Sequence, residues 1–434
     1  MFKRLFILIL SLNAFINLSA QEPLLHPKQV ASFYELKYST KSNRLFWFDD
    51  NTESASLRKT LIHLIDSCAQ RKWIGGTYHL KLLKDADKKP ATDSVTLKKF
   101  DFYYTDAAIA LLTETWKGYK VQPWVEFDAV SPKYKDSDEQ FILERFLEIE
   151  NSNKFIQELR GLEPVSAEYK LLQTACNQFY FAGKLDSLRL CLISLNQWKW
   201  VHHFNLPSFI LINLASSNLY YFEKGQLVLK MKTVVGKPKT PSPMFAAWCE
   251  KLILYPYWYV PSSIFYNEFL EKIQKNVSWI DQNNMQVVDG NGKVIDHHKL
   301  NWYSYTYGNF PYILRQSTGC DNSLGVLKFD IVTPFGVYLH DTNNKTAFLS
   351  GHRYYSHGCI RLEEPIALAQ KVLPSGIDTT FLQSCFKEQK PVDKLLNQPI
   401  AVFSMYMPFF PASRTKLSFY KDVYKLLPAS HKTK

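Results

Sequence analysis

The chain is poor in clustered cysteine, with seven scattered cysteines in 434 residues and no CxxC pair. Cysteine pairs at short spacing mark zinc sites, and even sets of cysteines at regular spacing mark disulfide frameworks. The sequence favours neither of these uses. An odd set of isolated cysteines instead directs attention to a single reactive thiol.

Beyond its first twenty residues, the sequence has no apolar stretch of the roughly 20 residues that a membrane-spanning helix needs. Those first residues combine basic Lys3–Arg4, apolar Leu5–Leu18 and small Ser19–Ala20, which are the parts of a secretory signal peptide. We expect cleavage after Ala20 and a mature protein in the periplasm. Leu18 is larger than usual for this part of a cleavage site, so an uncleaved anchor is the alternative.

The composition is that of a folded, basic protein, with 46% hydrophobic and 21% charged residues and a formal charge of +12. A chain of this length can bury a large core and predicts two or three domains. The positive charge favours an anionic partner such as a cell envelope. A nucleic acid has the same sign of charge, but export argues against it, and we expect no nucleic-acid partner.

The hydrophobic pattern divides the chain after about residue 203. Helical spacing recurs at Leu57–Cys68 and again around residues 141–149, which predicts a mostly helical scaffold domain over residues 21–203. From Pro207 the pattern turns to short extended segments, including Ser208–Asn213 and residues 226–235, separated by turns. The fold class is therefore α+β, with a β-rich domain over residues 204–386.

An insertion interrupts this β-rich domain at residues 262–318. It contains a helix-like run, Phe265–Ile273, and an aromatic run, Trp302–Tyr307. Long insertions of this kind often act as lids over a site, and we expect the same here. Strand patterns return at Leu327–Val332 and Val337–His340, and a helical one follows at Glu363–Leu373; residues 387–434 form a C-terminal extension.

One segment brings together the residues of a cysteine-based reaction. His340 ends a predicted strand, and fifteen residues later comes Ser356-His357-Gly358-Cys359-Ile360-Arg361. A thiol has a pKa near ~8.5, so a neighbouring imidazole must take its proton before the sulfur attacks a carbonyl. Gly358 allows close backbone approach, and backbone N–H groups near Cys359 would hold an oxyanion. A buried, inert cysteine is the competing interpretation of Cys359 alone.

The spacing resembles the signature of the YkuD-type L,D-transpeptidase family: a histidine, about fifteen residues, then Ser/Thr-His-Gly-Cys, a hydrophobic residue and Arg or Asn. The resemblance implies that Cys359 is the nucleophile and His340 the general base, with the Gly358 carbonyl orienting the imidazole. It places His357 and Arg361 at the substrate site. The family also contributes the expectation of a mixed, sandwich-like β domain.

Three further residues enter the predicted substrate site. Ser356 would support the loop before the cysteine, Tyr338 lies two residues before the histidine, and Trp258 belongs to an aromatic run that could stack on a glycan or stem peptide. Ordinary core packing is the competing interpretation for the aromatic residues. Asp341 could tune the imidazole, but turn formation explains it equally well, so it stays outside the catalytic set.

Weaker motifs extend the resemblance to the long periplasmic, YcbB-like subgroup with an N-terminal scaffold domain. They occur in family order at Tyr104–Ala108, Leu162–Pro164, Asn196–Trp200, Val234–Lys237 and Pro256–Pro261. The segment Asn322–Gly325, which leads into the strand pattern at Leu327–Val332, is also family-like.

Three departures from the family pattern bear on substrate docking. Tyr255 stands where this subgroup often has Asn, Cys320 follows Gly319, and no peptidoglycan-binding module fits between Cys176 and Cys191. Cys320 could pair with Cys359 under oxidation, but a spectator thiol is the interpretation that we favour.

The histidine pairs His202–His203 and His297–His298 do not predict a metal site. Adjacent histidines on a strand point to opposite faces, and no matching carboxylate cluster is evident. Surface or loop histidines are the interpretation that we favour, and we expect no metal and no cofactor.

The resemblance implies attack by Cys359 on the third residue of a donor tetrapeptide in a peptidoglycan stem. The resulting thioester would pass to an acceptor amine on a neighbouring stem, giving a 3-3 cross-link. Carbapenem-type β-lactams are the expected acylating inhibitors. Two alternatives remain: an L,D-carboxypeptidase or D-amino-acid exchange enzyme with the same residues, and a non-catalytic wall-binding scaffold.

Overall fold

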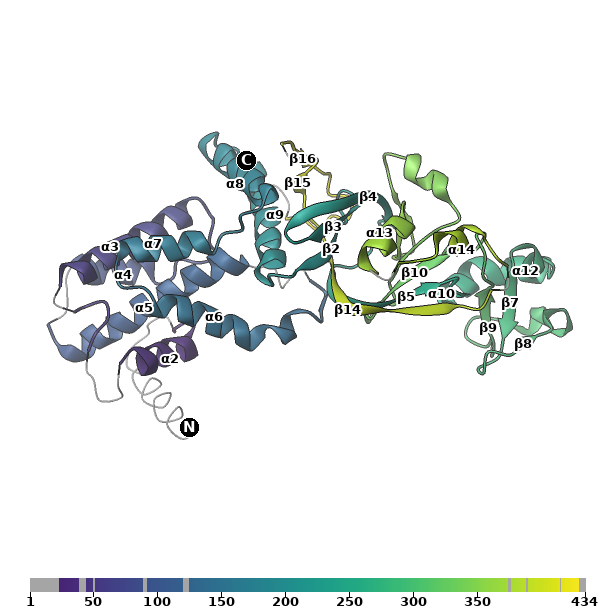
Figure 1. The fold of residues 1–434 in the computed structure, drawn as a ribbon, viewed down its shortest axis with the longest axis horizontal. Helices are drawn as coiled ribbons and strands as arrows, with labels where there is room; N and C mark the ends of the chain where they lie inside the picture. Colours follow the sequence, from purple (N-terminus) through teal and green to yellow (C-terminus); the bar gives the residue numbers. More distant parts are fainter. Residues whose placement is uncertain are drawn as a thin grey trace.

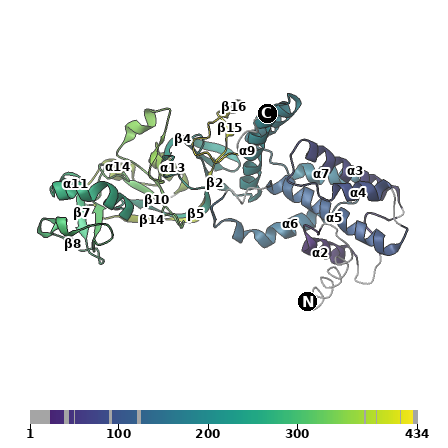
Figure 2. The same ribbon diagram turned by 180° about the vertical axis from the view of Figure 1, so that it is seen from behind.

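The computed structural model describes residues 23–38, 44–49, 51–88, 92–119, 125–373, 376–387, 389–413 and 415–428. The predicted signal peptide and its cleavage position lie outside these residues. The described chain is elongated, with helices at one end, a large β-sheet in the middle and the insertion at the other end (Figures 1 and 2). The helices within the described ranges are all too short or too polar to cross a membrane.

The scaffold domain is a cluster of amphipathic helices around its own aromatic-rich core. Side-chain caps fix where some of these helices begin: Asn51 accepts from the Ser54 N–H, and Asp93 accepts from the Thr96 N–H. Trp47 is fully buried at the centre of the core. The scaffold elements are α2 (Pro27–Lys37), α3 (Thr52–Gln70), α4 (Leu80–Lys88), α5 (Ser94–Lys117), α6 (Lys135–Leu147) and α7 (Ser152–Gly161).

Two further helices join the scaffold to the β-sheet. They are α8 (Ala167–Phe181) and α9 (Leu185–His203), and they pack along each other. Trp198 and Trp200 of α9 are buried in one hydrophobic cluster with Phe209 and Phe403 of the sheet. The helical and β-rich parts therefore share a core, which explains the tryptophan-rich sequence at the end of α9.

The described residues form one ten-stranded sheet that closes on itself. Its order is β1-β5-β10-β11-β13-β4-β3-β2-β14, β12 pairs with β4, and β14 also pairs with β5. The strands are β1 (Phe127–Asp128), β2 (Ser208–Asn213), β3 (Asn218–Glu223), β4 (Gln226–Gly236), β5 (Phe245–Leu254), β10 (Leu327–Ile331), β11 (Leu339–His340), β12 (Tyr354–Ser356), β13 (Ile360–Leu362) and β14 (Val392–Met405).

The C-terminal part of the chain completes this sheet. Strand β14 lies between β2 and β5, pairing with β2 in parallel and with β5 in antiparallel register. The expected boundary at residue 386 therefore separates segments that share one sheet. Helices α13 (Pro365–Val372) and α14 (Thr379–Gln383) precede β14, and β15 (Phe409–Pro411) pairs with β16 (Leu417–Phe419) after it.

The insertion has a sheet and a hydrophobic core of its own. Its strands β6 (Trp258–Tyr259), β9 (Ile313–Gln316), β7 (Met285–Val288) and β8 (Val294–Ile295) pair in that order. The expected helix at Phe265–Ile273 is present as a continuous helical run. It comprises α10 (Ser262–Ile264), η3 (Phe265–Phe269) and α11 (Leu270–Lys275), and it is followed by α12 (Trp279–Gln282), η4 (His297–Lys299) and η5 (Trp302–Ser304).

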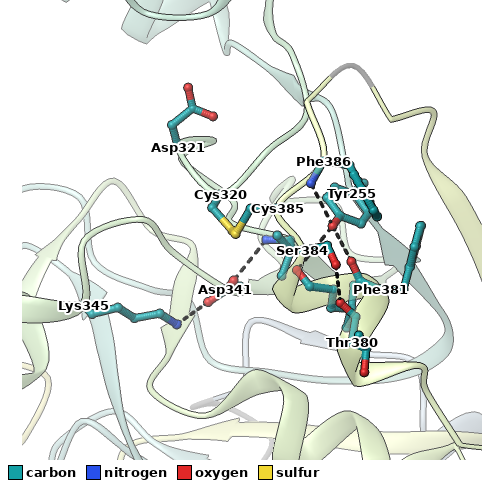
Figure 3. The surroundings of a disulfide bond; sticks show 12 residues. Tyr255, Cys320, Asp321, Asp341, Lys345, Thr380, Phe381, Ser384, Cys385 and Phe386 are labelled. Atoms are coloured by element: carbon teal, nitrogen blue, oxygen red, sulfur yellow. Dashed lines mark hydrogen bonds and ion pairs between the residues drawn. A yellow bond between two sulfur atoms is a disulfide. The ribbon is translucent and has the colours of Figure 1, made fainter.

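A disulfide bond joins Cys320 to Cys385, with a Cα–Cα distance of 5.1 Å (Figure 3). The expectation that Cys320 is a spectator thiol was therefore wrong, and so was the inference against disulfides. The two cysteines lie 65 residues apart in the sequence, so spacing alone offers no signal for their pairing.

Tyr255 fixes the same segment from another direction. Its hydroxyl donates to the Phe381 carbonyl at 2.6 Å and accepts from the Phe386 N–H at 3.2 Å (Figure 3). Two departures from the family pattern, Tyr255 and Cys320, thus form one clamp on residues 381–386. Their position in the structure explains them as support for the fold.

Candidate active site

Strand pairing and side-chain contacts bring four chemically active side chains together. His340 of β11 lies opposite Arg361 of β13 in parallel register, and the Ile360 N–H donates to the Tyr338 carbonyl at 3.1 Å. Tyr338 and Cys359 each come directly before these strands, and the contacts of Tyr338 with His340 and of Cys359 with Tyr338 and Arg361 place them with this pair.

Cys359 is partly buried, and its sulfur contacts the Gly336 carbonyl oxygen at 4.0 Å. Burial raises the pKa of its thiol above the usual value. Hydrogen bonds from the backbone and the phenol of Tyr338 act in the opposite direction, as do the positive charges of Lys328 and Arg361. The resting sulfur is consequently a protonated thiol whose anionic form has donors and cations nearby.

His340 is buried, and its Nδ1 donates to the carbonyl oxygen of Asp341. Burial, followed by the charge of Arg361, lowers the pKa of the imidazole to about 3. The ring is therefore neutral near pH 7 and able to accept a proton at Nε2, which makes no hydrogen bond within the described part of the chain. Among the described residues, the Cys359 sulfur also makes no hydrogen bond to this ring.

The expected role of the Gly358 carbonyl needs correction. This carbonyl accepts from the Ser242 hydroxyl at 2.6 Å, and the Asp341 carbonyl holds the His340 ring instead. Gly358 itself has φ +126°, a backbone conformation that residues other than glycine rarely adopt. Its contribution is thus the shape of the loop before Cys359.

Ser356 supports this loop from beneath. Its hydroxyl donates to the Cys359 carbonyl at 2.6 Å and accepts from the Gly358 N–H at 3.1 Å, and its side chain is buried. Ser356 therefore positions the cysteine, and its hydroxyl is already committed to the loop. We expected backbone N–H groups beside Cys359 to hold an oxyanion. The N–H groups of Gly358 and Ile360 already donate to other acceptors in this structure, so neither is free for that role.

Tyr338 and Trp258 connect the sulfur to the base of the insertion. The Tyr338 ring lies 5.7 Å from the His340 ring, centroid to centroid. Burial raises the pKa of its phenol, the Cys359 side chain raises it further, and a hydrogen bond with the Trp258 side chain opposes this. The structure thus places Tyr338 beside the cysteine and Trp258 beside Tyr338.

Lys328 was missed by the sequence analysis. It pairs with His340 across β10 and β11, and its Nζ lies 4.4 Å from the centre of the Tyr338 ring. The alternation in Leu327–Ile331 was a usable signal, because it puts Lys328 on the polar face of a predicted strand. The site therefore contains two cations, Lys328 and Arg361.

Residues 207–389 match the family model of the YkuD L,D-transpeptidase catalytic domain, and residues 28–175 match the model of the scaffold domain. This segment is an L,D-transpeptidase catalytic domain. The matched segment contains the strands that carry Cys359 and His340. The order of a scaffold domain followed by this domain is the YcbB-like architecture that the sequence predicted.

A curated relative from Haemophilus influenzae, whose name assigns it to the L,D-transpeptidases, is 29% identical over 206 residues. The alignment covers 46% of this chain and 42% of the relative, so the chain spans less than half of that protein. Among solved structures, an L,D-transpeptidase from Mycobacterium smegmatis shares 14% identity, covering 46% of this chain and 58% of that one, with TM-score 0.23. A cysteine-to-serine mutant of Enterococcus faecium L,D-transpeptidase also shares 14% identity, covering 46% and 50%, with TM-score 0.22. Scores this low support no structural conclusion.

A polar contact joins the insertion to the signature loop of the L,D-transpeptidase domain. His357 Nε2 lies 2.7 Å from the Glu268 carboxylate of η3 and 3.3 Å from Lys237 Nζ. The His357 side chain is 38% exposed and that of Glu268 is 41% exposed, so the pair lies at the surface. The predicted lid therefore touches the loop next to the nucleophile.

The pair His202–His203 lies apart from this site and is held by packing. His203 Nε2 lies 3.5 Å from an Asp138 oxygen, and its ring contacts Trp116. Burial lowers the pKa of His202 to about 4. The pair therefore packs inside the fold at the end of α9, whereas the sequence favoured surface or loop positions for it.

Proposed function

We propose that this protein is a peptidoglycan L,D-transpeptidase that forms 3-3 cross-links through a cysteine thioester. The observation that carries the proposal is the grouping of His340 and Arg361, paired on β11 and β13, with Tyr338 and Cys359, which come directly before these strands. The match of residues 207–389 to the family model of the L,D-transpeptidase catalytic domain supports the same reaction class.

In the first step, the Cys359 sulfur attacks the carbonyl carbon of the third stem residue of a donor tetrapeptide. The thiol proton passes to His340 Nε2 and then to the departing amine, so that D-Ala leaves and a thioester remains. In the second step, an amine of a neighbouring stem attacks the thioester. Its proton returns to the sulfur through His340, and the new amide bond is the cross-link.

The electrostatics favour this sequence of proton transfers. Both reactants are neutral at rest, because burial raises the pKa of the Cys359 thiol and lowers that of the His340 imidazole to about 3. Proton transfer then accompanies sulfur attack, and the Asp341 carbonyl keeps the imidazole oriented. Lys328 and Arg361 stabilise the negative charge that develops, and they also attract the terminal carboxylate of the donor.

The acceptor decides between cross-linking and the alternative of hydrolysis or amino-acid exchange. Water competes with the acceptor amine for the thioester, so exclusion of water by the insertion favours the amine. The contact between Glu268 and His357 supports a closed arrangement of the insertion over the signature loop. We therefore place cross-linking ahead of carboxypeptidase activity.

The deciding experiment incubates the purified mature chain with muropeptides that carry tetrapeptide stems, and identifies the products by mass spectrometry. We expect 3-3 linked dimers with the wild type and none with Cys359→Ala. Cys68→Ala is the matched control, because Cys68 is also a partly buried free cysteine and lies in the scaffold. Trimmed tripeptides without dimers would assign the chain to the carboxypeptidases.

Acylation by a carbapenem gives a second test that needs no acceptor. We propose that such a β-lactam forms a covalent adduct with Cys359, which intact-protein mass spectrometry would detect as one added inhibitor per chain. The adduct should be absent from Cys359→Ala and present in Cys68→Ala. A wild-type chain that forms neither adduct nor product would favour the non-catalytic wall-binding scaffold.

A further inference from the structure

We propose that the insertion binds a zinc ion through Asp281, His297 and His298. One ligand atom from each residue can be chosen so that all three atoms lie within 4.8 Å of one another. The expectation that the histidine pair points to opposite faces was wrong, because the pair begins a 3-10 helix rather than a strand. The missing carboxylate comes from α12, which the sequence gave no reason to place beside this pair.

The spacing of the three groups fits a metal ion. His297 Nε2 lies 3.3 Å from one Asp281 oxygen, and His298 Nε2 lies 3.2 Å from the other. Charge-assisted hydrogen bonds between such groups are shorter, at about 2.7–2.9 Å. Zinc–nitrogen and zinc–oxygen bonds of about 2.0–2.2 Å set tetrahedral ligand atoms roughly 3.3–3.5 Å apart. The two imidazole-to-carboxylate separations are close to that edge length, and ligand atoms of the two histidines can be chosen within 4.8 Å of each other.

The hydrophobic core of the insertion holds the ligands in place. Ile280, next to Asp281, is fully buried in this core. The buried Trp302 donates its indole N–H to the His297 carbonyl at 2.9 Å, and Asp296 caps the His298 N–H at 3.1 Å. The ligand-bearing segments are thus fixed by contacts that do not depend on the ion, which reduces the cost of ordering them on binding.

The donor set selects the metal. Two imidazoles and one carboxylate suit zinc and similar first-row ions, whereas calcium and magnesium prefer all-oxygen sites. Three protein ligands leave a fourth position for water or for an anionic group from solution. Because Asp281 lies on α12 and the histidines on η4, a bound ion would join two segments of the insertion that are otherwise held by separate contacts.

The test is isothermal titration calorimetry, with zinc chloride added to tag-free mature protein. The protein carries Cys359→Ser, so that the partly exposed thiol cannot bind zinc. We expect one zinc per chain, with binding weakened by at least about tenfold in Asp281→Asn and in His298→Gln, since even residues behind the ligands typically change metal affinity by ~10–100-fold. His63→Gln changes an exposed histidine of α3 and should leave the affinity unchanged. Cobalt substitution should give the absorption of a tetrahedral site.

Equal zinc affinity in the parent and in both ligand variants would overturn the proposal, and so would the absence of zinc binding by the parent. Circular dichroism establishes that each variant is folded. His298→Gln is the safer variant, because 57% of that side chain is exposed and its loss removes little packing. These outcomes do not depend on the proposed transpeptidase activity.

Discussion

The scaffold and the β-sheet differ in how many hydrogen bonds their polar side chains make inside the fold. In the scaffold, Asp106 is fully buried and accepts hydrogen bonds from the backbone N–H groups of Leu25 and His26, at 2.8 and 2.6 Å. His79 Nε2 reaches the same carboxylate at 2.8 Å. Three donors therefore surround this carboxylate, which belongs to one of the family-like motifs.

The face of the sheet that we propose to be catalytic has fewer such bonds. His340 uses one ring nitrogen on the Asp341 carbonyl, and the Cys359 sulfur contacts the Gly336 carbonyl oxygen and the backbone and phenol of Tyr338. Arg361 makes no hydrogen bond within the described ranges. Polar groups that are buried, even in part, are costly without partners, and we propose that a substrate supplies the missing partners on this face. The comparison separates polar groups that stabilise a domain from those kept available for chemistry.

The first prediction removes the proton acceptor. His340→Gln should lower the rate of carbapenem acylation by about 10²–10⁴-fold, the usual contribution of a general base, while leaving the thermal unfolding midpoint nearly unchanged. The rate is followed by intact-protein mass spectrometry. His352→Gln is the control, because this exposed histidine lies in the loop before the signature. A fully active His340→Gln variant would contradict the assignment of His340 as the base.

The second prediction removes the satisfied carboxylate. Asp106→Ala leaves three donors without their acceptor and should destabilise the scaffold by about 3 kcal/mol or more, measured by urea unfolding followed by far-ultraviolet circular dichroism. Acylation of Cys359 in the folded fraction should remain at the wild-type rate. Asp85→Ala changes an exposed carboxylate of α4 and should have little effect on stability. A large loss of acylation in folded Asp106→Ala would break the comparison.

The sequence identified the residues that the structure brings together at β11 and β13 better than it identified the residues around them. The signature, His340 followed after fifteen residues by Ser356-His357-Gly358-Cys359, can be read directly from the sequence. Its two ends lie together in the structure because β11 and β13, which are close in sequence, pair in parallel. Contacts between distant segments escaped prediction: Lys328 comes from another strand, Ser242 supports the Gly358 carbonyl, and Cys320 pairs with Cys385. Spacing along a chain does not determine which distant loops meet.

The same reason explains the fold boundaries. The change from helical to extended pattern near Pro207 correctly located the start of the β-rich part, because each pattern reflects local burial. Strand β14 was missed as a member of the sheet, since its partners β2 and β5 lie far earlier in the sequence.

The third prediction concerns the clamp formed by the disulfide and Tyr255. Cys320→Ser opens a loop with a sequence separation of 65 residues and should lower the free energy of unfolding by up to about 4 kcal/mol in the chain-entropy model. Cys385→Ser and the double variant should show the same loss, because all three remove one bond. Acylation of Cys359 should change little in each folded variant. An additive loss in the double variant would show that the cysteines act separately.

The smallest expected effect comes from the two cations of the site. Burial lowers the pKa of His340 most, and among the charges Arg361 lowers it more than Lys328 does. For the Cys359 thiol the order of the two cations is reversed, because Lys328 lowers its pKa more than Arg361 does. Arg361→Gln should therefore raise the pKa of the imidazole from about 3 toward 6.5, and bring an acidic limb into the pH profile of acylation. Lys328→Gln should chiefly raise the pKa of the thiol, so that iodoacetamide alkylation needs a higher pH.

Both cation variants should change rates at pH 7 by about tenfold or less, since one pKa unit corresponds to about 1.4 kcal/mol. The pH profiles of acylation and alkylation, measured on the same protein preparations, separate the two effects. Identical profiles for Arg361→Gln and the wild type would mean that the guanidinium does not act on the imidazole. In that case, its lack of hydrogen-bond partners would reflect only its partial exposure to water, and it would leave the catalytic side of the comparison.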